Sequence, residues 1–185
     1  MGSELDAAHY DKGYRTNPMY QLDADHAPWS MLWYWVIGRA SGDETIADFG
    51  CGSGHLAELL HRRGHPPHRY MGVDFSEVAL RQARERAPGY RFVKGTLPGA
   101  VKKIATLDAT AVFCEVLEHI TKDLGALKML RSGTRVLATV PSKDSRGHVR
   151  HFVTMNSVCK RYETVLHLRS VERIGGAYAF EGRRK

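Results

Sequence analysis

A glycine-rich turn between an apolar segment and a helical pattern constrains this chain of 185 residues more than any other feature. Residues 45–55 read Thr-Ile-Ala-Asp-Phe-Gly-Cys-Gly-Ser-Gly-His, so a run typical of a buried strand leads into three alternate glycines. Glycine adopts dihedral angles that are closed to other residues, and without a Cβ it lets a ligand lie against the backbone. The leucines that follow have helical spacing, which predicts a helix whose N-terminal N–H groups point back at the turn.

A second apolar segment, residues 70–75, carries an acidic residue whose spacing from the turn along the sequence is typical of a nucleotide-binding site. Asp74 lies 20 residues after Gly54, about the spacing at which a carboxylate reaches ribose hydroxyls. Together the turn and Asp74 predict a ligand that carries adenosine. Asp48 makes the pattern Asp-x-Gly-x-Gly-x-Gly, and a carboxylate beside the turn suits a cationic ligand better than a pyrophosphate. The alternative is a glycine-rich turn that binds nothing.

At these residues the chain resembles the class I S-adenosylmethionine-dependent methyltransferases, and the resemblance covers most of residues 45–152. It implies that the glycine turn lies against the methionine part of the cofactor, that Asp48 lies near its ammonium group and that Asp74 holds the ribose. The segment Lys94-Gly95-Thr96 departs from the family, since many relatives have an acidic residue there that contacts adenine. The implied cofactor-binding residues are Asp48, Gly50, Cys51, Gly52, Gly54, Asp74, Phe75, Thr96 and Cys114.

Strand and helix patterns alternate from Thr45 onward, which predicts a parallel sheet with helices on both faces. The predicted strands are 45–49, 70–74, 90–93, 109–114 and 135–140, followed by a hairpin of 164–174 and 176–180. The predicted helices are 29–39, one after an N-cap at Ser76, 123–130 and 154–161. We therefore expect a Rossmann-like, doubly wound α/β fold with a mostly parallel seven-stranded sheet and an antiparallel C-terminal hairpin.

Length and composition favour one methyltransferase domain, which we divide into an N-terminal helical cap, 1–40, and a cofactor-binding core, 41–185. The chain has no apolar run of the roughly 20 residues that span a bilayer and no signal-peptide pattern, which predicts a cytoplasmic protein. Its 3 cysteines are odd in number and far apart, so reduced thiols are expected. The net charge of +7 admits an acidic partner such as nucleic acid without identifying one.

Two further stretches allow two interpretations each. The aromatic residues from Trp29 to Trp35 have helical spacing, which predicts a helix packed on the sheet, while stacking on an aromatic substrate or a base is the alternative. The basic residues from Arg169 to Lys185 either form a solvated, flexible end or contact nucleic acid.

Polar residues that suit catalysis or metal binding follow the fourth and fifth predicted strands, where ligands bind in open α/β sheets. Glu115, Glu118 and His119 share one face if this segment is helical. His148 and His151 follow the fifth strand, and Asp123 is a weaker candidate ligand. Carboxylates with imidazoles suit a divalent cation such as Mg, Mn, Fe or Zn. The tentative metal ligands are Glu115, Glu118, His119 and His148, and the same four are the candidate catalytic residues.

The Glu-x-x-Glu-His run is similar to those of two metal-dependent groups, the quinone-biosynthesis O-methyltransferases and the Hen1-type small-RNA 2′-O-methyltransferases. The resemblance implies transfer of the methyl group of S-adenosylmethionine to a small-molecule hydroxyl, with assistance from a divalent metal. Without a metal, His119 or His148 is the candidate general base, or the residues form a hydrogen-bonded cluster. An RNA methyltransferase of the 2′-O type and a non-catalytic protein that binds the cofactor or its product are the other two readings.

Overall fold

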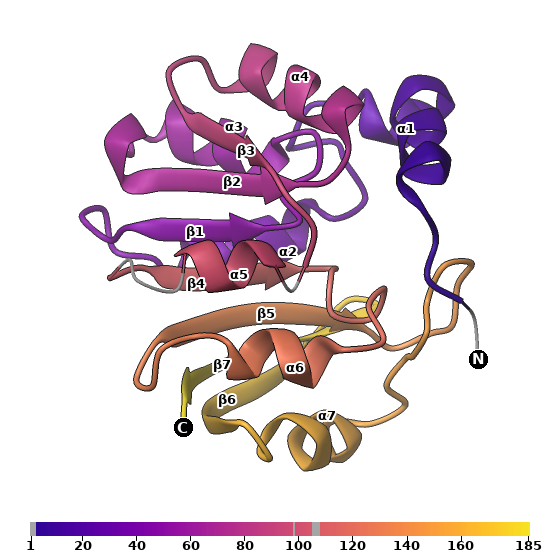
Figure 1. Cartoon of the computed structure of the whole chain (residues 1–185), viewed down its shortest axis with the longest axis vertical. Helices are drawn as coiled ribbons and strands as arrows, with labels where there is room; N and C mark the ends of the chain where they lie inside the picture. The colour runs from indigo at the N-terminus through magenta and orange to yellow at the C-terminus, as the bar shows by residue number, and fades with distance from the viewer. Residues whose placement is uncertain (1–2, 98, 105–107) are drawn as a thin grey trace.

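A seven-stranded sheet with the strand order β3-β2-β1-β4-β5-β7-β6 forms the centre of the molecule (Figure 1). The structure is a computed structural model that describes residues 3–97, 99–104 and 108–185. Five strands pair in parallel: β1 (Ile46–Phe49), β2 (Tyr70–Asp74), β3 (Arg91–Lys94), β4 (Thr110–Cys114) and β5 (Arg135–Pro141). The antiparallel strands are β6 (Leu166–Ile174) and β7 (Ala177–Arg184). This confirms the predicted fold class.

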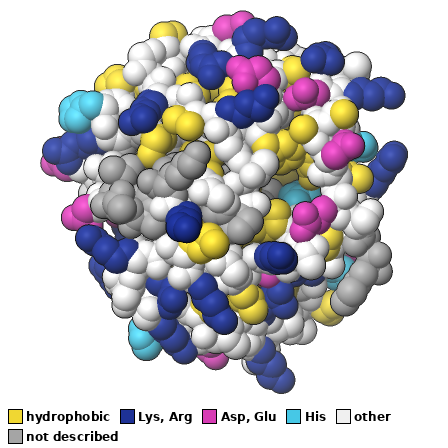
Figure 2. Space-filling model, viewed as in Figure 1, with side chains coloured by type: hydrophobic (Ala, Val, Ile, Leu, Met, Phe, Trp, Pro, Cys, Tyr) yellow, Lys and Arg dark blue, Asp and Glu magenta, His cyan; other side chains and the backbone are white. Residues whose placement is uncertain are grey.

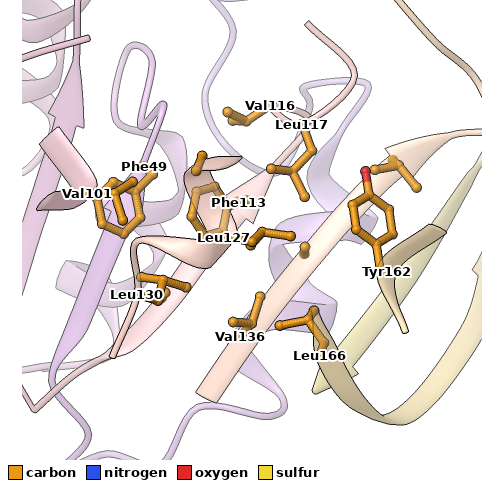
Figure 3. Close-up of a cluster of buried hydrophobic side chains, with 14 of the residues drawn as sticks. Phe49, Val101, Phe113, Val116, Leu117, Leu127, Leu130, Val136, Tyr162 and Leu166 are labelled. Atoms are coloured by element: carbon orange, nitrogen blue, oxygen red, sulfur yellow. The ribbon is translucent and has the colours of Figure 1, made fainter. Parts of the chain in front are cut away.

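Helices cover both faces of the sheet. One face carries α2 (Ser30–Ile37), α3 (His55–Arg62) and α4 (Glu77–Arg86), and the other carries α5 (Gly99–Ile104), α6 (Asp123–Lys128) and α7 (Met155–Tyr162). Every residue of β1 and β2 is buried, as expected for parallel strands that are covered on both sides. Figure 3 shows the core of the second face, where Phe49 and Phe113 stack with ring centroids 4.9 Å apart.

Capping residues mark where several of these helices begin, and a glycine marks where one of them ends. The Ser76 hydroxyl accepts a hydrogen bond from the Ala79 N–H at the start of α4. Thr154 and Ser157 form a capping box at the start of α7. Gly64 follows α3 with a φ of +74°, the left-handed conformation that commonly ends a helix. Two short 3-10 helices, η1 (Pro18–Tyr20) and η2 (Pro67–Arg69), connect longer elements.

The structure differs from the sequence-based prediction at both ends of the chain. Helix α1 (Ala7–Thr16), which the Asp6 carboxylate caps, lies before the first helix predicted from the sequence. Strand β7 extends to Arg184 because it pairs with the whole of β5, so Arg183 and Arg184 belong to the sheet and not to a flexible end. Helix α5 was not predicted either. Within the described residues, no helix is both long and apolar enough to cross a membrane.

The carboxyl ends of β1, β2, β4 and β5 meet at one edge of the sheet. Phe49 is in register with Val73, and Cys114 is in register with Thr139. Figure 1 shows α1 beside this edge, far in the sequence from the strands whose ends it faces. The division into a cap (1–40) and a core (41–185) stays a prediction, and its first part contains α1, η1 and α2.

Candidate functional site

The glycine turn after β1 adopts the backbone that its sequence requires. Gly50, Gly52 and Gly54 have φ angles of +73°, +53° and +85°. A Cβ on Gly52 would lie 2.8 Å from the Tyr14 hydroxyl, so this part of the backbone has no room for a side chain. The Asp74 carboxylate accepts hydrogen bonds from the N–H groups of Gly52 (3.0 Å) and Ser76 (2.8 Å), which ties the end of β2 to the turn.

A cavity of about 870 Å³ lies over this edge of the sheet. Its walls come from the glycine turn, the segments after β2, β3 and β4, helix α1 and the loop of residues 143–148. Seven of the nine predicted cofactor residues line it: Gly50, Cys51, Gly52, Asp74, Phe75, Thr96 and Cys114. The volume is within the usual range for a small-molecule site.

Asp48 and Gly54 do not line the cavity. Asp48 is only 2% exposed, and its carboxylate accepts a hydrogen bond of 2.7 Å from the Tyr70 hydroxyl. Burial raises the pKa of Asp48 to about 7. The contact expected between Asp48 and the ammonium group of a cofactor therefore stays a prediction. In this structure the Asp48 carboxylate does not reach the cavity wall. Gly54 instead makes room for α4, since a Cβ there would lie 2.7 Å from Ala83 Cα.

The segment after β4 is a turn and not the helix considered above, so its three polar side chains do not share a helical face. Glu115 has a φ of +55°, a left-handed conformation found at no other non-glycine residue of the described chain. Thr139 holds it there: the Thr139 hydroxyl accepts from the Glu115 N–H (2.9 Å) and donates to the Glu115 carboxylate (3.0 Å). Burial raises the pKa of Glu115 to about 7.

Glu118 and His119 face a histidine from the loop after β5. One ligand atom from each of Glu118, His119 and His148 lies within 4.8 Å of the others. Both carboxylate oxygens of Glu118 are buried without a hydrogen-bond partner in the described residues, and burial raises the Glu118 pKa well above its usual range. Its Oε1 lies 3.6 Å from His119 Nε2. Of the four tentative metal ligands, Glu115 lies outside this group.

The other two candidate ligands have different partners. His151 lies 3.8 Å from Asp144, on the outside of the loop. Asp123 is fully buried and receives two hydrogen bonds of 2.7 Å from Arg161. Ile120 packs partly against the core and also lines the cavity.

Helix α1 contributes site residues that the sequence analysis missed. The Tyr10 hydroxyl oxygen lies 3.0 Å from His119 Nδ1, and Tyr10 and Tyr14 both line the cavity. The signal that could have found them is their i, i+4 spacing, which places both rings on one face of a helix.

Helix α2 packs on the sheet, as predicted, and one of its aromatic rings also borders the cavity. Trp35 is buried in the core beneath the Arg39 guanidinium, whose carbon lies 4.2 Å from a Trp35 ring centroid. Trp33 lines the cavity and stacks on His55, with ring centroids 4.6 Å apart. Trp29 and Trp33 line the cavity and Trp35 does not, and stacking on a substrate or a base stays a prediction.

Comparison with known proteins finds methyltransferases that resemble part of this chain. The chain is 43% identical over 88 residues to a trans-aconitate 2-methyltransferase from Rhodopseudomonas palustris strain BisB18, a match that covers 45% of this chain and 34% of that protein. Matches to the first curated relatives thus span well under half of their length.

Two solved structures show the fold. A TehB-like S-adenosylmethionine-dependent methyltransferase from Corynebacterium glutamicum superposes with a TM-score of 0.67 at 16% identity and covers 97% of this chain and 100% of its own. Magnesium protoporphyrin IX methyltransferase from Synechocystis PCC 6803, with bound S-adenosylmethionine, gives a TM-score of 0.62 at 14% identity and covers 100% of both chains.

The family match covers the glycine turn after β1 and the carboxyl ends of β2 and β4. Residues 46–139, about half of the chain, match the family described as "Methyltransferase domain". The likeness of the Glu-x-x-Glu-His run to metal-dependent groups stays a prediction. With its fold, its glycine turn and this match taken together, the chain belongs to the methyltransferase domain family, within the class I S-adenosylmethionine-dependent methyltransferases.

Proposed function

We propose that this protein transfers the methyl group of S-adenosylmethionine to an oxygen atom of a small-molecule acceptor. One observation carries the proposal: the glycine turn, Asp74, His119 and His148 line a single cavity. The relatives named after trans-aconitate support a small acceptor. A pocket that holds both ligands brings them into reacting geometry, which is a large part of what such a transfer requires.

The residues around the turn fit S-adenosylmethionine. Gly50 and Gly52 line the cavity with bare backbone, Tyr14 lies against Gly52, and Asp74 borders the cavity beside them. We infer that Asp74 receives the ribose hydroxyls and that Phe75 and Thr96 border the adenine. When bound, the cofactor supplies a methyl group that its sulfonium makes electrophilic.

His119 is placed to accept a proton from an acceptor hydroxyl. The Gly147 carbonyl lies 3.0 Å from His119 Nδ1 and can only accept, so Nδ1 carries the hydrogen and Nε2 keeps its lone pair. Burial lowers the pKa of His119 to about 4, so the imidazole is uncharged at neutral pH. A neutral imidazole at the cavity wall meets the geometric requirement for a general base.

We further infer that Glu118, His119 and His148 can hold a divalent cation, in which case His119 Nε2 is a ligand and not the base. The support is their unpaired atoms: both Glu118 carboxylate oxygens and His148 Nδ1 are buried without partners in the described chain. The His119 ring uses its other nitrogen on the Gly147 carbonyl, as metal-bound histidines usually do. Two imidazoles and one carboxylate favour Fe, Mn or Zn over Mg, and such an ion would act as a Lewis acid on an acceptor oxygen.

The two alternative functions have less support. Figure 2 shows Lys and Arg side chains scattered over the visible face and not gathered in one stripe, and Arg169 lies 3.3 Å from Glu181. The face drawn in Figure 2 therefore gives a nucleic-acid acceptor no continuous basic stripe to bind. A protein that only binds the cofactor would bury the Glu118 carboxylate at a cost and gain nothing from it.

The test uses methyl-labelled S-adenosylmethionine with purified protein. One arm contains a panel of small organic acids and phenols that includes trans-aconitate, another contains RNA, and each is run with and without a chelator. We expect label in the small-molecule arm only, and loss of transfer with the chelator if the cation is required. Glu118→Ala and His119→Ala should abolish transfer but leave the Kd of S-adenosylhomocysteine nearly unchanged, with exposed His68→Ala as the control. Label in RNA alone, or equal loss of binding and transfer, contradicts the proposal.

A further inference from the structure

Tyr10 joins the two ends of the cavity. It is 109 positions from His119 in the sequence, yet its hydroxyl oxygen lies 3.0 Å from His119 Nδ1. The Tyr10 ring meets the His119 ring edge-on, with centroids 5.9 Å apart, and meets the Phe75 ring edge-on at 5.3 Å. Phe75 follows Asp74 at the cofactor end, so a single side chain contacts both the predicted cofactor wall and the candidate base.

Two oxygens surround one nitrogen of the His119 ring. The Gly147 carbonyl and the Tyr10 hydroxyl each lie 3.0 Å from Nδ1. Because the carbonyl accepts only, the Nδ1 hydrogen points toward these two oxygens and the ring keeps one tautomer. Nε2 is then left without a hydrogen, facing Glu118 Oε1 at 3.6 Å. The Gly147 carbonyl thus sets the tautomer of His119, and the Tyr10 hydroxyl, which accepts the same Nδ1 hydrogen, restricts the rotation of the ring.

We propose that Tyr10 is a positioning residue for His119, which it holds with Nε2 free to act on the acceptor. The inference rests on the proposed role of His119 as a base or a ligand. Partners of this kind, one shell removed from the reacting atoms, commonly change activity or metal affinity by about 10-fold to 100-fold when they are removed.

Helix α1 reaches this position through polar contacts with α4. The Ser76 hydroxyl donates to the Asp11 carboxylate, and the Gln82 side-chain N–H donates to the Tyr14 carbonyl at 3.0 Å. No residue of α1 is fully buried, so these contacts and the Tyr10 ring fix the helix. The Tyr14 hydroxyl meanwhile lies against Gly52. One face of α1 therefore borders the cofactor turn at Tyr14 and the acceptor end at Tyr10.

Tyr10→Phe isolates the hydroxyl, because phenylalanine keeps the ring packing against Phe75. We expect a thermal midpoint close to that of the unsubstituted protein, a Kd for S-adenosylhomocysteine within about 2-fold, and a kcat lower by roughly 10-fold or more with a smaller change in KM. Tyr34→Phe is the matched control, since the Tyr34 hydroxyl also has a side-chain hydrogen-bond partner, the Asp25 carboxylate, but Tyr34 lies outside the cavity.

A second readout does not depend on an acceptor. Long-range ¹H–¹⁵N spectra of the histidine rings should show His119 with hydrogen on Nδ1 alone. Tyr10→Phe should keep this tautomer, which Gly147 sets, but should shift the Nδ1 signal. If His119→Ala loses transfer while Tyr10→Phe keeps both the kcat and the spectrum of the unsubstituted protein, the proposal for Tyr10 is wrong and the proposed function stands. If His119→Ala transfers methyl groups normally, the proposed role of His119 fails first.

Discussion

At the level of single residues, Gly54 and Gly64 offer a matched pair of substitutions. Both have a positive φ, +85° and +74°, but a Cβ on Gly54 would lie 2.7 Å from Ala83 Cα, whereas nothing lies within 4 Å of a Cβ on Gly64. We expect Gly64→Ala to cost about 1 kcal/mol, because only the backbone conformation is strained. Gly54→Ala should cost about 1–3 kcal/mol more, because α3 and α4 must move apart. Equal unfolding free energies in urea would contradict this close helix packing.

His55 should give the stability of the protein a dependence on pH. Its side chain is 4% exposed, and burial lowers its pKa to about 4. The unfolded chain, with a histidine pKa near 6.5, takes up the proton at higher pH than the folded chain does. The free energy of unfolding therefore falls as the pH drops from about 6.5 to 4, by up to about 3 kcal/mol.

The measurement is urea unfolding at several pH values with His55→Gln, which should flatten this part of the profile. Exposed His68→Gln is the control and should leave the slope as it is. A profile that His55→Gln does not change would show that other groups carry the dependence.

The role of a residue could be predicted from the sequence where it depends on near neighbours in the chain. It could not be predicted where it depends on contacts with distant segments. Ser76 was predicted as an N-cap, and it caps α4. Glu118 was recognised as polar and well placed, but its complete burial depends on the loop after β5, where the Val149 N–H donates to the Glu118 carbonyl at 2.8 Å. A single sequence gives no sign of that contact.

At the level of elements, the parallel strands were predicted best. The bounds of β2 match those predicted, because a strand buried on both faces reads as a short apolar run between polar residues. Helix α1 was missed because it has no apolar stripe, and its position depends on polar contacts with α4 more than 60 positions away. The sequence allows a helix directly after β4. The structure has a turn there, because Glu115 adopts a left-handed conformation that a helix cannot contain.

Arg150 should be important for the geometry of this turn. Its guanidinium donates to the backbone carbonyls of Leu117, Ile120 (2.6 Å) and Thr121 (3.0 Å), and it also lies 3.4 Å from Asp123. We expect Arg150→Met to reduce transfer by at least about 10-fold beyond any loss of folded protein, because charge-assisted hydrogen bonds to three carbonyls hold the turn that carries Glu118 and His119.

Arg161 supplies the control for Arg150. It pairs with the same Asp123 through two bonds of 2.7 Å but donates to none of the turn carbonyls in the described contacts. Arg161→Met should lower the thermal midpoint, because it weakens the pairing of a buried carboxylate, and should leave the turnover of the folded fraction near normal. Equal turnover in the two variants would show that the hydrogen bonds from Arg150 to the turn carbonyls contribute to stability alone.

At the level of the whole molecule, the site is assembled from both halves of the chain. The sheet brings four strand ends to one edge, and this part follows from the fold class that the sequence predicted. The cover over that edge comes from α1 and residues 143–148, which are separated by more than 100 positions. Their contact was not predictable, because it depends on how two irregular segments pack once the sheet has formed.

A cofactor that binds only the folded chain should stabilise the whole domain. S-adenosylhomocysteine at 100 times its Kd should raise the free energy of unfolding by about 2.7 kcal/mol, which for a domain of this size is a rise of roughly 5–10 °C in the thermal midpoint. Asp74→Ala should lose most of this shift, because it removes the carboxylate that borders the cavity and orders Gly52. Asp108→Ala, at a side chain that is 100% exposed, should keep it. A full shift in Asp74→Ala would mean that the turn holds the cofactor without help from β2.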